Sequence, residues 1–221
     1  MTEDGAYPVE PAVDAATARF WDELYQERDQ VWSGRANAVL AEVVAPLPPG
    51  AALDLGCGEG GDAIWLAERG WQVTAVDVSA TALGRLSAAA ARADLASRIT
   101  VARHDLTRTF PAGRYDLVSA QFLQSPLELP REAVLRAAAR AVAPGGRLLV
   151  VEHGEPPSWA RESHPHARFA SPEEILAALD LDPDGWHTER LGAVRRTGTG
   201  PNGETGTLVD HVVLVRRREQ R

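Results

Sequence analysis

The stretch LDLGCGEGGDAIWLAERG, residues 53–70, decides the fold of this chain. Its glycines at 56, 58 and 61 have the G-x-G-x-x-G spacing that turns a strand into a helix around the pyrophosphate of a dinucleotide. The same turn begins as DLGCG, with Asp54 two residues before the first glycine. The stretch therefore predicts a strand, a cofactor-binding turn and a helix, and the other residues must identify the cofactor.

The rest of the chain repeats this alternation of strand and helix. Short runs rich in Val, Leu and Ile predict strands at 51–55, 71–77, 98–102, 115–120 and 146–152. Helices are expected at 13–28, 35–45, 61–69, 80–93, 131–142 and 172–179. The last runs, 186–199 and 207–218, flank the glycine-rich GPNGETG and predict an antiparallel hairpin. We expect an α/β fold, a Rossmann-like three-layer sandwich with a mostly parallel sheet.

The composition limits the class of protein. With 221 residues, of which 44% are hydrophobic, the chain is long enough for one domain with a full core. No apolar run reaches the roughly 18 to 20 residues that span a bilayer. The acidic, proline-bearing N-terminus is unlike a secretory signal, so we expect a cytoplasmic protein.

The charged residues exclude several kinds of chemistry. A net charge of −8 argues against a general nucleic-acid binder. All 23 basic residues are arginine, which leaves no lysine for a Walker-type loop, a Schiff base or an amine nucleophile.

The carboxyl ends of the strands are the predicted binding edge, because ligands collect there in an open α/β sheet. Gly56 and Gly58 would let the backbone approach a ligand closely, and Gly60 would let the next helix begin beside it. Asp77 ends the second strand, where its carboxylate can accept hydrogen bonds from both hydroxyls of a ribose. These residues fit NAD and S-adenosylmethionine equally well.

Three features favour S-adenosylmethionine. The carboxylate of Asp54 would repel a pyrophosphate but attract a ligand with an amino group and a sulfonium. Asp105 and Leu106 follow the third strand, where the carboxylate can accept from the adenine amino group and the leucine can cover the ring. The chain also ends in a hairpin rather than in a second half-domain for a nicotinamide substrate. An NAD(P)-dependent oxidoreductase is a remote alternative, without a Tyr-x-x-x-Lys pair because there is no lysine.

The motifs DLGCGEG, AVDVS, HDL, YDLV and APGGRLLV resemble those of class I S-adenosylmethionine-dependent methyltransferases over about residues 35–152. This resemblance implies a seven-stranded sheet with an antiparallel C-terminal strand. It also implies the cofactor-binding residues: Asp54, Gly56, Cys57, Gly58 and Gly60 at the methionine end, Asp77 at the ribose, Val78, Asp105 and Leu106 at the adenine, and Gln121 beside the sulfonium. Cys57, the one cysteine, is otherwise a small residue that fits the turn.

The N-terminal segment FWDELYQERDQVWSGRANAVL is most similar to small-molecule methyltransferases of the thiopurine and tellurite-resistance type, in which an aromatic-rich helix folds over the cofactor. By that resemblance Trp32 and either Arg35 or Asn37 contact the cofactor, and Trp21 and Tyr25 line the acceptor pocket beside Trp32. The alternative is ordinary core packing, which Trp and Tyr at helical spacing usually serve.

The acceptor side has fewer signals. His153 directly follows the fifth strand and is expected to face the mouth of the sheet, where it would orient or deprotonate an acceptor. Trp159 and Arg168 belong to a proline-rich segment that would cover the substrate, although an arginine there equally suits a solvated surface. His164 and His166 lie on either side of a proline with no acid triad nearby, and they predict no metal site.

The predicted layout is a single methyltransferase domain over 1–221, with an N-terminal helical lid (1–45), a cofactor-binding core (46–152), and a substrate-covering insertion with the C-terminal hairpin (153–221). We expect methyl transfer from S-adenosylmethionine to a small-molecule thiol, other soft nucleophile, or oxygen or nitrogen acceptor, by in-line displacement. A sensor or scaffold that binds the cofactor without catalysis is the alternative. No nucleic-acid or membrane partner is expected, and the residues identify neither the acceptor nor the oligomeric state.

Overall fold

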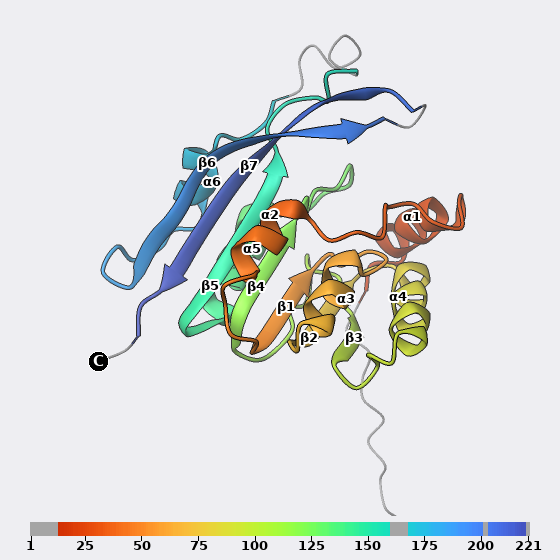
Figure 1. Cartoon of the computed structure of the whole chain (residues 1–221), viewed down its shortest axis with the longest axis horizontal. Helices are drawn as coiled ribbons and strands as arrows, with labels where there is room; N and C mark the ends of the chain where they lie inside the picture. Colours follow the sequence, from red (N-terminus) through yellow and green to blue (C-terminus); the bar gives the residue numbers. More distant parts are fainter. Residues whose placement is uncertain (1–12, 160–167, 201–202, 220–221) are drawn as a thin grey trace, which may run out of the picture.

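The computed structural model describes residues 13–159, 168–200 and 203–219, and it places one twisted sheet between two layers of helices (Figure 1). The strands are β1 (Ala51–Leu55), β2 (Gln72–Asp77), β3 (Ile99–Arg103), β4 (Tyr115–Gln121), β5 (Val142–His153), β6 (Trp186–Thr199) and β7 (Thr205–Arg217). They lie in the order β3-β2-β1-β4-β5-β7-β6. β1 to β5 are parallel, and β7 is antiparallel to its neighbours β5 and β6. The predicted fold, including the antiparallel strand near the C-terminus, is confirmed.

Helices cover both faces of this sheet. They are α1 (Ala15–Gln26), α2 (Ala38–Val44), α3 (Gly61–Glu68), α4 (Ala80–Arg92), α5 (Arg131–Ala141) and α6 (Pro172–Ala178). α2, α3 and α4 pack on one face in a core around Leu40, Leu66 and Leu86, whereas α5 and α6 pack on the other around Leu135 and Ile175. Within the part of the chain that the structure describes, no helix has the length and hydropathy needed to cross a bilayer.

The strand β5 begins earlier than the sequence predicts. Val142 already pairs with Tyr115 of β4, the register then shifts, and Gly145 has a φ of +81°. The chain therefore continues along β4 through an irregular stretch, where a separate turn was expected before residue 146. The proline and glycines at 144–146 are typical of a turn. Here they lie within a strand because the residues on either side of them, Val142 and Arg147, pair with β4.

The turn between β1 and α3 lies at the carboxyl edge of the sheet. Gly56, Gly58 and Gly60 have φ values of +66°, +53° and +85°, a region that other residues rarely adopt. A Cβ at Gly58 would lie 2.9 Å from the hydroxyl oxygen of Tyr25, and one at Gly60 would overlap the side chain of Leu86. Glycine is thus required both by the backbone conformation and by the close approach of α1 and α4.

Candidate active site

The buried carboxylate of Asp54 and the half-buried carboxylate of Asp62 lie beside the glycine turn, and neither pairs with a basic side chain of the described residues. Asp54 lies on β1, and no described residue forms a hydrogen bond with its Oδ2 atom. Burial raises the pKa of Asp54 well above its usual range, and the charges of Asp62 and Asp77 add to this effect. Burial also raises the pKa of Asp62 to about 6, although the backbone N–H of Asn37 donates to it at 2.6 Å. Carboxylates that lie close enough to repel each other in this way favour a positively charged group beside them.

Asp77 connects the turn to the end of β2. Its two carboxylate oxygens accept hydrogen bonds from the backbone N–H groups of Gly58 and Ser79, each at 2.9 Å. Burial raises the pKa of Asp77, and these hydrogen bonds oppose that rise. Because a carboxylate oxygen has two lone pairs, each oxygen can accept one further hydrogen bond.

Asp105 lies at the end of β3, next to the end of β2. The N–H of His104 donates to the carbonyl oxygen of Asp77 at 3.0 Å, which places the two acids at neighbouring strand ends. The Oδ2 atom of Asp105 accepts from the N–H of Asp14 at 3.0 Å, and Thr107 donates twice to Oδ1. Burial opposes ionisation of Asp105, but these hydrogen bonds hold its pKa below the usual range. The N-terminal segment thus contacts a predicted adenine-binding carboxylate.

Tyr25 and Trp32 lie over the glycine turn. The indole Nε1 of Trp32 donates to the hydroxyl oxygen of Tyr25 at 3.1 Å, and both rings approach Gly58. Tyr25 is buried, whereas Trp32 is 56% exposed. The ring of Trp21 lies 6.5 Å from that of Tyr25. Arg35 has an exposed side chain, and it is the backbone of this residue that lies against the next part of the turn.

Glu59, in the middle of the turn, fastens the segment that carries Trp32. Its carboxylate accepts from the backbone N–H groups of Val31 and Trp32 and from Nη1 of Arg85, the last at 2.6 Å. Sequence reasoning missed Glu59 and Asp62. Both are acids within a glycine-rich turn or at the start of its helix, and their type and position were the available signal.

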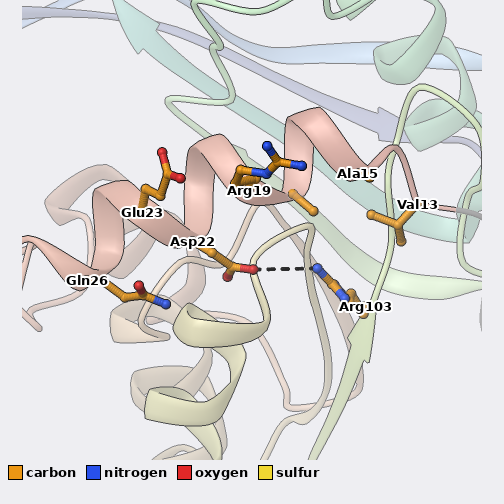
Figure 2. A pocket seen from close by; sticks show the side chains of 8 residues that line it. Val13, Ala15, Arg19, Asp22, Glu23, Gln26 and Arg103 are labelled. Carbon is orange, nitrogen blue, oxygen red and sulfur yellow. Dashed lines mark ion pairs between the residues drawn. The ribbon is translucent and has the colours of Figure 1, made fainter.

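Asp22, on α1, connects this helix to the start of α4, and sequence reasoning missed it as well. Its Oδ1 atom accepts from the hydroxyl of Ser79 at 2.6 Å and from the N–H of Thr81 at 2.9 Å. Its other oxygen pairs with Arg103 at 3.6 Å, beside a hollow of about 660 Å³ between α1 and the end of β3 (Figure 2). Arg103 also donates to the carbonyl oxygen of Val78 at 2.9 Å, so the hollow adjoins the predicted adenine site.

A second polar group lies at the ends of β4 and β5. Gln121 donates to the hydroxyl of Ser119 at 2.8 Å, but its Oε1 atom is buried without a partner. The imidazole of His153 stacks on the ring of Phe122, with 4.3 Å between the ring centroids. Its Nδ1 atom is buried, and no described residue forms a hydrogen bond with it. Burial lowers the pKa of His153, so the neutral imidazole is favoured.

Two residues of the C-terminal hairpin complete this group, and neither was singled out from the sequence. Asp210 of β7 is fully buried, with Oδ1 at 3.9 Å from Nδ1 of His153. Arg196 of β6 donates to the two oxygens of Asp210 at 2.5 and 3.3 Å. They are far from His153 in sequence, so only strand pairing brings them together.

Other predicted residues lie away from these groups. Trp159 packs against Gly198, Gly200 and Gly206 of the β6–β7 hairpin. Arg168 pairs with Glu174 at the start of α6, and its side chain is 86% exposed. His164 and His166 lie outside the described residues, among which no cluster of three metal-ligating side chains occurs.

Val78 and Leu106 are half-buried at the strand ends, and Leu106 packs against the core on the α5 and α6 face. Cys57 lies in the turn, where its N–H donates to the carbonyl oxygen of Val76 at 3.0 Å. Burial raises the pKa of the Cys57 thiol well above its usual range, which keeps the thiol protonated.

Comparison with known proteins places this geometry in a family. A family model described as a methyltransferase domain matches residues 52–146. Ribosomal RNA small subunit methyltransferase C of Alcanivorax borkumensis is 35% identical over 132 residues, which are 56% of this chain and 39% of that protein. The 2-heptyl-1-hydroxyquinolin-4(1H)-one methyltransferase of Mycobacteroides abscessus is 35% identical over 105 residues, 46% of this chain and 45% of that protein. Ubiquinone biosynthesis O-methyltransferase of Sodalis glossinidius is 29% identical over 77% of this chain and 74% of that protein.

Solved structures agree on the fold. A structure described under the conversion of a disulfide bond into a thioacetal group during echinomycin biosynthesis has a TM-score of 0.70 and 23% identity, covering 92% of this chain and 94% of its own. TehB from Haemophilus influenzae has a TM-score of 0.65 and 17% identity, covering 90% of this chain and 66% of its own.

The sheet order and the acids around the glycine turn are those expected of a class I S-adenosylmethionine-dependent methyltransferase fold, and residues 52–146 match the methyltransferase-domain family. Proteins of this family bind S-adenosylmethionine, which the similarity supports as the cofactor here. The chain spans less than half the length of the first two curated relatives described above. One of these is named for ribosomal RNA, so the expectation that no nucleic acid is involved is not supported.

Proposed function

We propose that this protein transfers the methyl group of S-adenosylmethionine to a small-molecule acceptor. The observation that carries the proposal is the buried Oδ2 atom of Asp54, which has no partner beside a turn of left-handed glycines. A buried charged oxygen without a partner is costly. The α-ammonium group of the cofactor would supply the missing hydrogen bond and charge, whereas a pyrophosphate would be repelled.

We assign each side chain around the turn to one part of the cofactor. Asp54, with Asp62 close by, would hold the ammonium group. Gly56 and Gly58, which have no side chain, would let the methionine end of the cofactor lie against the backbone. The free lone pairs of Asp77 suit the ribose hydroxyls. The other contacts that we propose are Cys57 and Gly60 in the turn, Val78, Asp105 and Leu106 at the adenine, Gln121 near the sulfonium, and Trp32 and Arg35 in the covering segment.

The N-terminal segment supports a role as a cover. Hydrogen bonds of Asp14 to Asp105, of Asp22 to Ser79 and of Trp32 to Glu59 connect it to three of the loops that carry predicted cofactor residues. Ordinary core packing does not explain a Trp32 ring that is more than half exposed above the turn. We therefore retain the lid interpretation of this segment, with Trp21 and Tyr25 on its inner side.

The cofactor supplies an activated methyl group when it is bound. The protein then acts chiefly by holding an acceptor in line with that group and by excluding water. Such alignment is worth effective molarities on the order of 10⁵ M or more. An ionised thiol would need no further help, whereas a hydroxyl acceptor would need a base.

The relatives and the net charge support a small-molecule acceptor. One relative is named for a 1-hydroxyquinolin-4(1H)-one and another for ubiquinone biosynthesis, and the net charge of −8 disfavours a phosphate backbone. A ribosomal RNA acceptor is the second candidate, favoured by the relative from Alcanivorax borkumensis. We further propose a cytoplasmic location, which the single cysteine, Cys57, supports because it allows no disulfide within this sequence.

Calorimetric titration tests the cofactor, with S-adenosylhomocysteine and NADH as ligands. We expect S-adenosylhomocysteine alone to bind, and Asp77→Ala to weaken that binding. Binding of NADH alone would contradict the proposal. Incubation with S-adenosylmethionine and a panel of thiols, phenols, amines and a ribosomal RNA fragment then separates an enzyme from a sensor, because a sensor binds the product without turnover.

A further inference from the structure

One face of the sheet carries polar groups from β1 across to β6. Asp54 of β1 is the register partner of Ser119 of β4, so the two side chains lie on the same face. Gln121 lies two residues beyond Ser119, and it pairs with Val151, two residues before His153. Because successive side chains alternate between faces, His153 shares the face of Gln121 and therefore that of Asp54.

These polar side chains, of Asp54, Ser119, Gln121 and His153, form a row that continues into the C-terminal hairpin. His153 pairs with Asp210 of β7, and Asp210 pairs with Val194 of β6, two residues before Arg196. The ion pair between Arg196 and Asp210 confirms that both side chains lie on one face. Leu123 links the row to the cofactor turn, because a Cβ at Gly56 would lie 2.7 Å from its Cδ1 atom.

This row holds most of the unsatisfied buried side-chain atoms found in the described ranges. They are Asp54 Oδ2, Gln121 Oε1, His153 Nδ1 and Arg131 Nε, and the first three belong to the row. Buried polar atoms in native proteins nearly always have partners, so unpartnered atoms that share one face indicate an incomplete site. The ammonium group of the cofactor would account for the unpartnered oxygen of Asp54, but it does not account for the unpartnered nitrogen of His153.

We propose that His153 is the general base of the reaction, that Asp210 and Arg196 position it, and that the acceptor is a weakly acidic hydroxyl compound of the phenol or enol type. The inference rests on the proposed function, since it names the acceptor of the same site. The ring of His153 is 37% exposed, while its Nδ1 atom is buried facing Asp210. Nε2 is thus the nitrogen available to an acceptor.

The charges of the group favour an oxygen acceptor. Asp210 and Arg196 neutralise each other, and the neutral imidazole adds no charge before the reaction. Once His153 takes a proton, the group carries one net positive charge beside the newly formed oxyanion. That charge stabilises an oxyanion, whereas an amine that has given up its proton is neutral and gains little from the charge, and an already ionised thiol would not need the base.

The step balances without any further reactant. The hydroxyl proton of the acceptor moves to Nε2 of His153, and the oxygen lone pair forms the new bond to the methyl carbon. The bond between methyl carbon and sulfur breaks with its electron pair left on sulfur, and the imidazolium then releases the proton to water. Protonated Nδ1 needs an acceptor, and Asp210 Oδ1 at 3.9 Å lies within a small movement of a hydrogen bond.

Two acceptor series test the inference: para-substituted phenols of graded acidity and the matching thiophenols. We expect His153→Gln to lower kcat on phenols by about 10²- to 10⁴-fold, most for the least acidic, and to change kcat on thiophenols only slightly. Binding of S-adenosylhomocysteine should be unchanged in this variant. Equal losses on both series, no loss on phenols, or wild-type turnover of thiophenols alone would overturn the inference and leave the proposed function intact.

Two pH profiles, one of them measured without acceptor, test the positioning role of Asp210. Among the described residues, the charged groups facing His153 are Asp210 from β7 and Arg196 from β6, while Glu152 and Arg131 pair on the opposite face. In Asp210→Asn, we expect the NMR titration of the His153 imidazole and the acid limb of kcat/KM on phenols to move to lower pH. An unmoved titration overturns the positioning role. Failure of the wild type to methylate either series overturns the acceptor class, and failure to bind S-adenosylhomocysteine overturns the proposed function as well.

Discussion

The indole N–H of Trp32 donates a hydrogen bond to the hydroxyl of Tyr25, and the two rings together cover Gly58. One residue of the pair comes from α1 and the other from the segment that Glu59 holds against the glycine turn. The covering segment is therefore attached to the cofactor turn through both its helix and its loop.

Tyr25→Phe should weaken binding of S-adenosylhomocysteine several-fold, because the loss of one hydrogen bond, worth about 1 kcal/mol, releases Trp32 from the turn. Calorimetry measures the change in Kd. Tyr115→Phe is the matched control, since that hydroxyl donates to the carbonyl oxygen of Ala112 outside the site. Equal Kd values for Tyr25→Phe and the wild type would show that the Tyr25 hydroxyl does not help to cover the cofactor.

Asp54→Asn should raise the Kd for S-adenosylhomocysteine by about 10- to 100-fold, as expected for loss of a charge-assisted hydrogen bond worth about 1.5–3 kcal/mol. The apo variant should be at least as stable to heat as the wild type, because the fold loses a buried carboxylate without a partner. Asp94→Asn, at an exposed position with a φ of +58°, is the control. A variant that binds as well as the wild type would remove the main support for the cofactor assignment.

The stability and the cofactor affinity should have opposite pH dependences around Asp62. Its pKa is about 6 in the folded protein against an ordinary value of 3.8, so the folded state binds more protons than the unfolded state between these two values. That contribution to stability is present below about pH 4 and is lost as the pH rises through 6. Cofactor binding should instead tighten over this range and release protons, because an ammonium group favours the ionised carboxylates.

Calorimetry in buffers of different ionisation enthalpy measures this proton release. Asp62→Asn should reduce both pH dependences. Proton uptake on binding near pH 6 would contradict the arrangement of Asp54 and Asp62 around a cation.

Gly60→Ala should destabilise the protein by about 1–3 kcal/mol, because φ is +85° and the new Cβ would overlap Leu86. Gly84→Ala, within α4 and with no atom within 4 Å of the new Cβ, should instead stabilise it by about 0.5–1 kcal/mol. Urea denaturation of both variants measures the difference. A fall in stability for Gly84→Ala together with no change for Gly60→Ala would refute this account of the turn.

Much of the proposed cofactor site lies in short segments that the sequence pattern identifies. The turn from Asp54 to Gly60, the acid at Asp77 and the pair at Asp105 each follow an apolar strand at fixed spacing. Parallel strands deliver their carboxyl ends to one edge, so a local pattern becomes a shared site without knowledge of long-range contacts. The strands and helices followed from the same local periodicity, and β5 departed from it where pairing with β4 overrode a turn signal.

The tertiary structure alone decided the acceptor side and the attachment of the N-terminal segment. Asp210 and Arg196 reach His153 only through the order β5-β7-β6, which inserts the last strand between the two before it. Sequence reasoning gave Glu59, Asp22 and Asp62 no role. The packing of α1, α2 and α4 gives each of these acids its hydrogen-bond or ion-pair partners. The sequence by itself determined the elements and the cofactor turn, since those depend on neighbouring residues. Strand order and helix packing, which join residues far apart in the chain, determined which polar groups meet on one face.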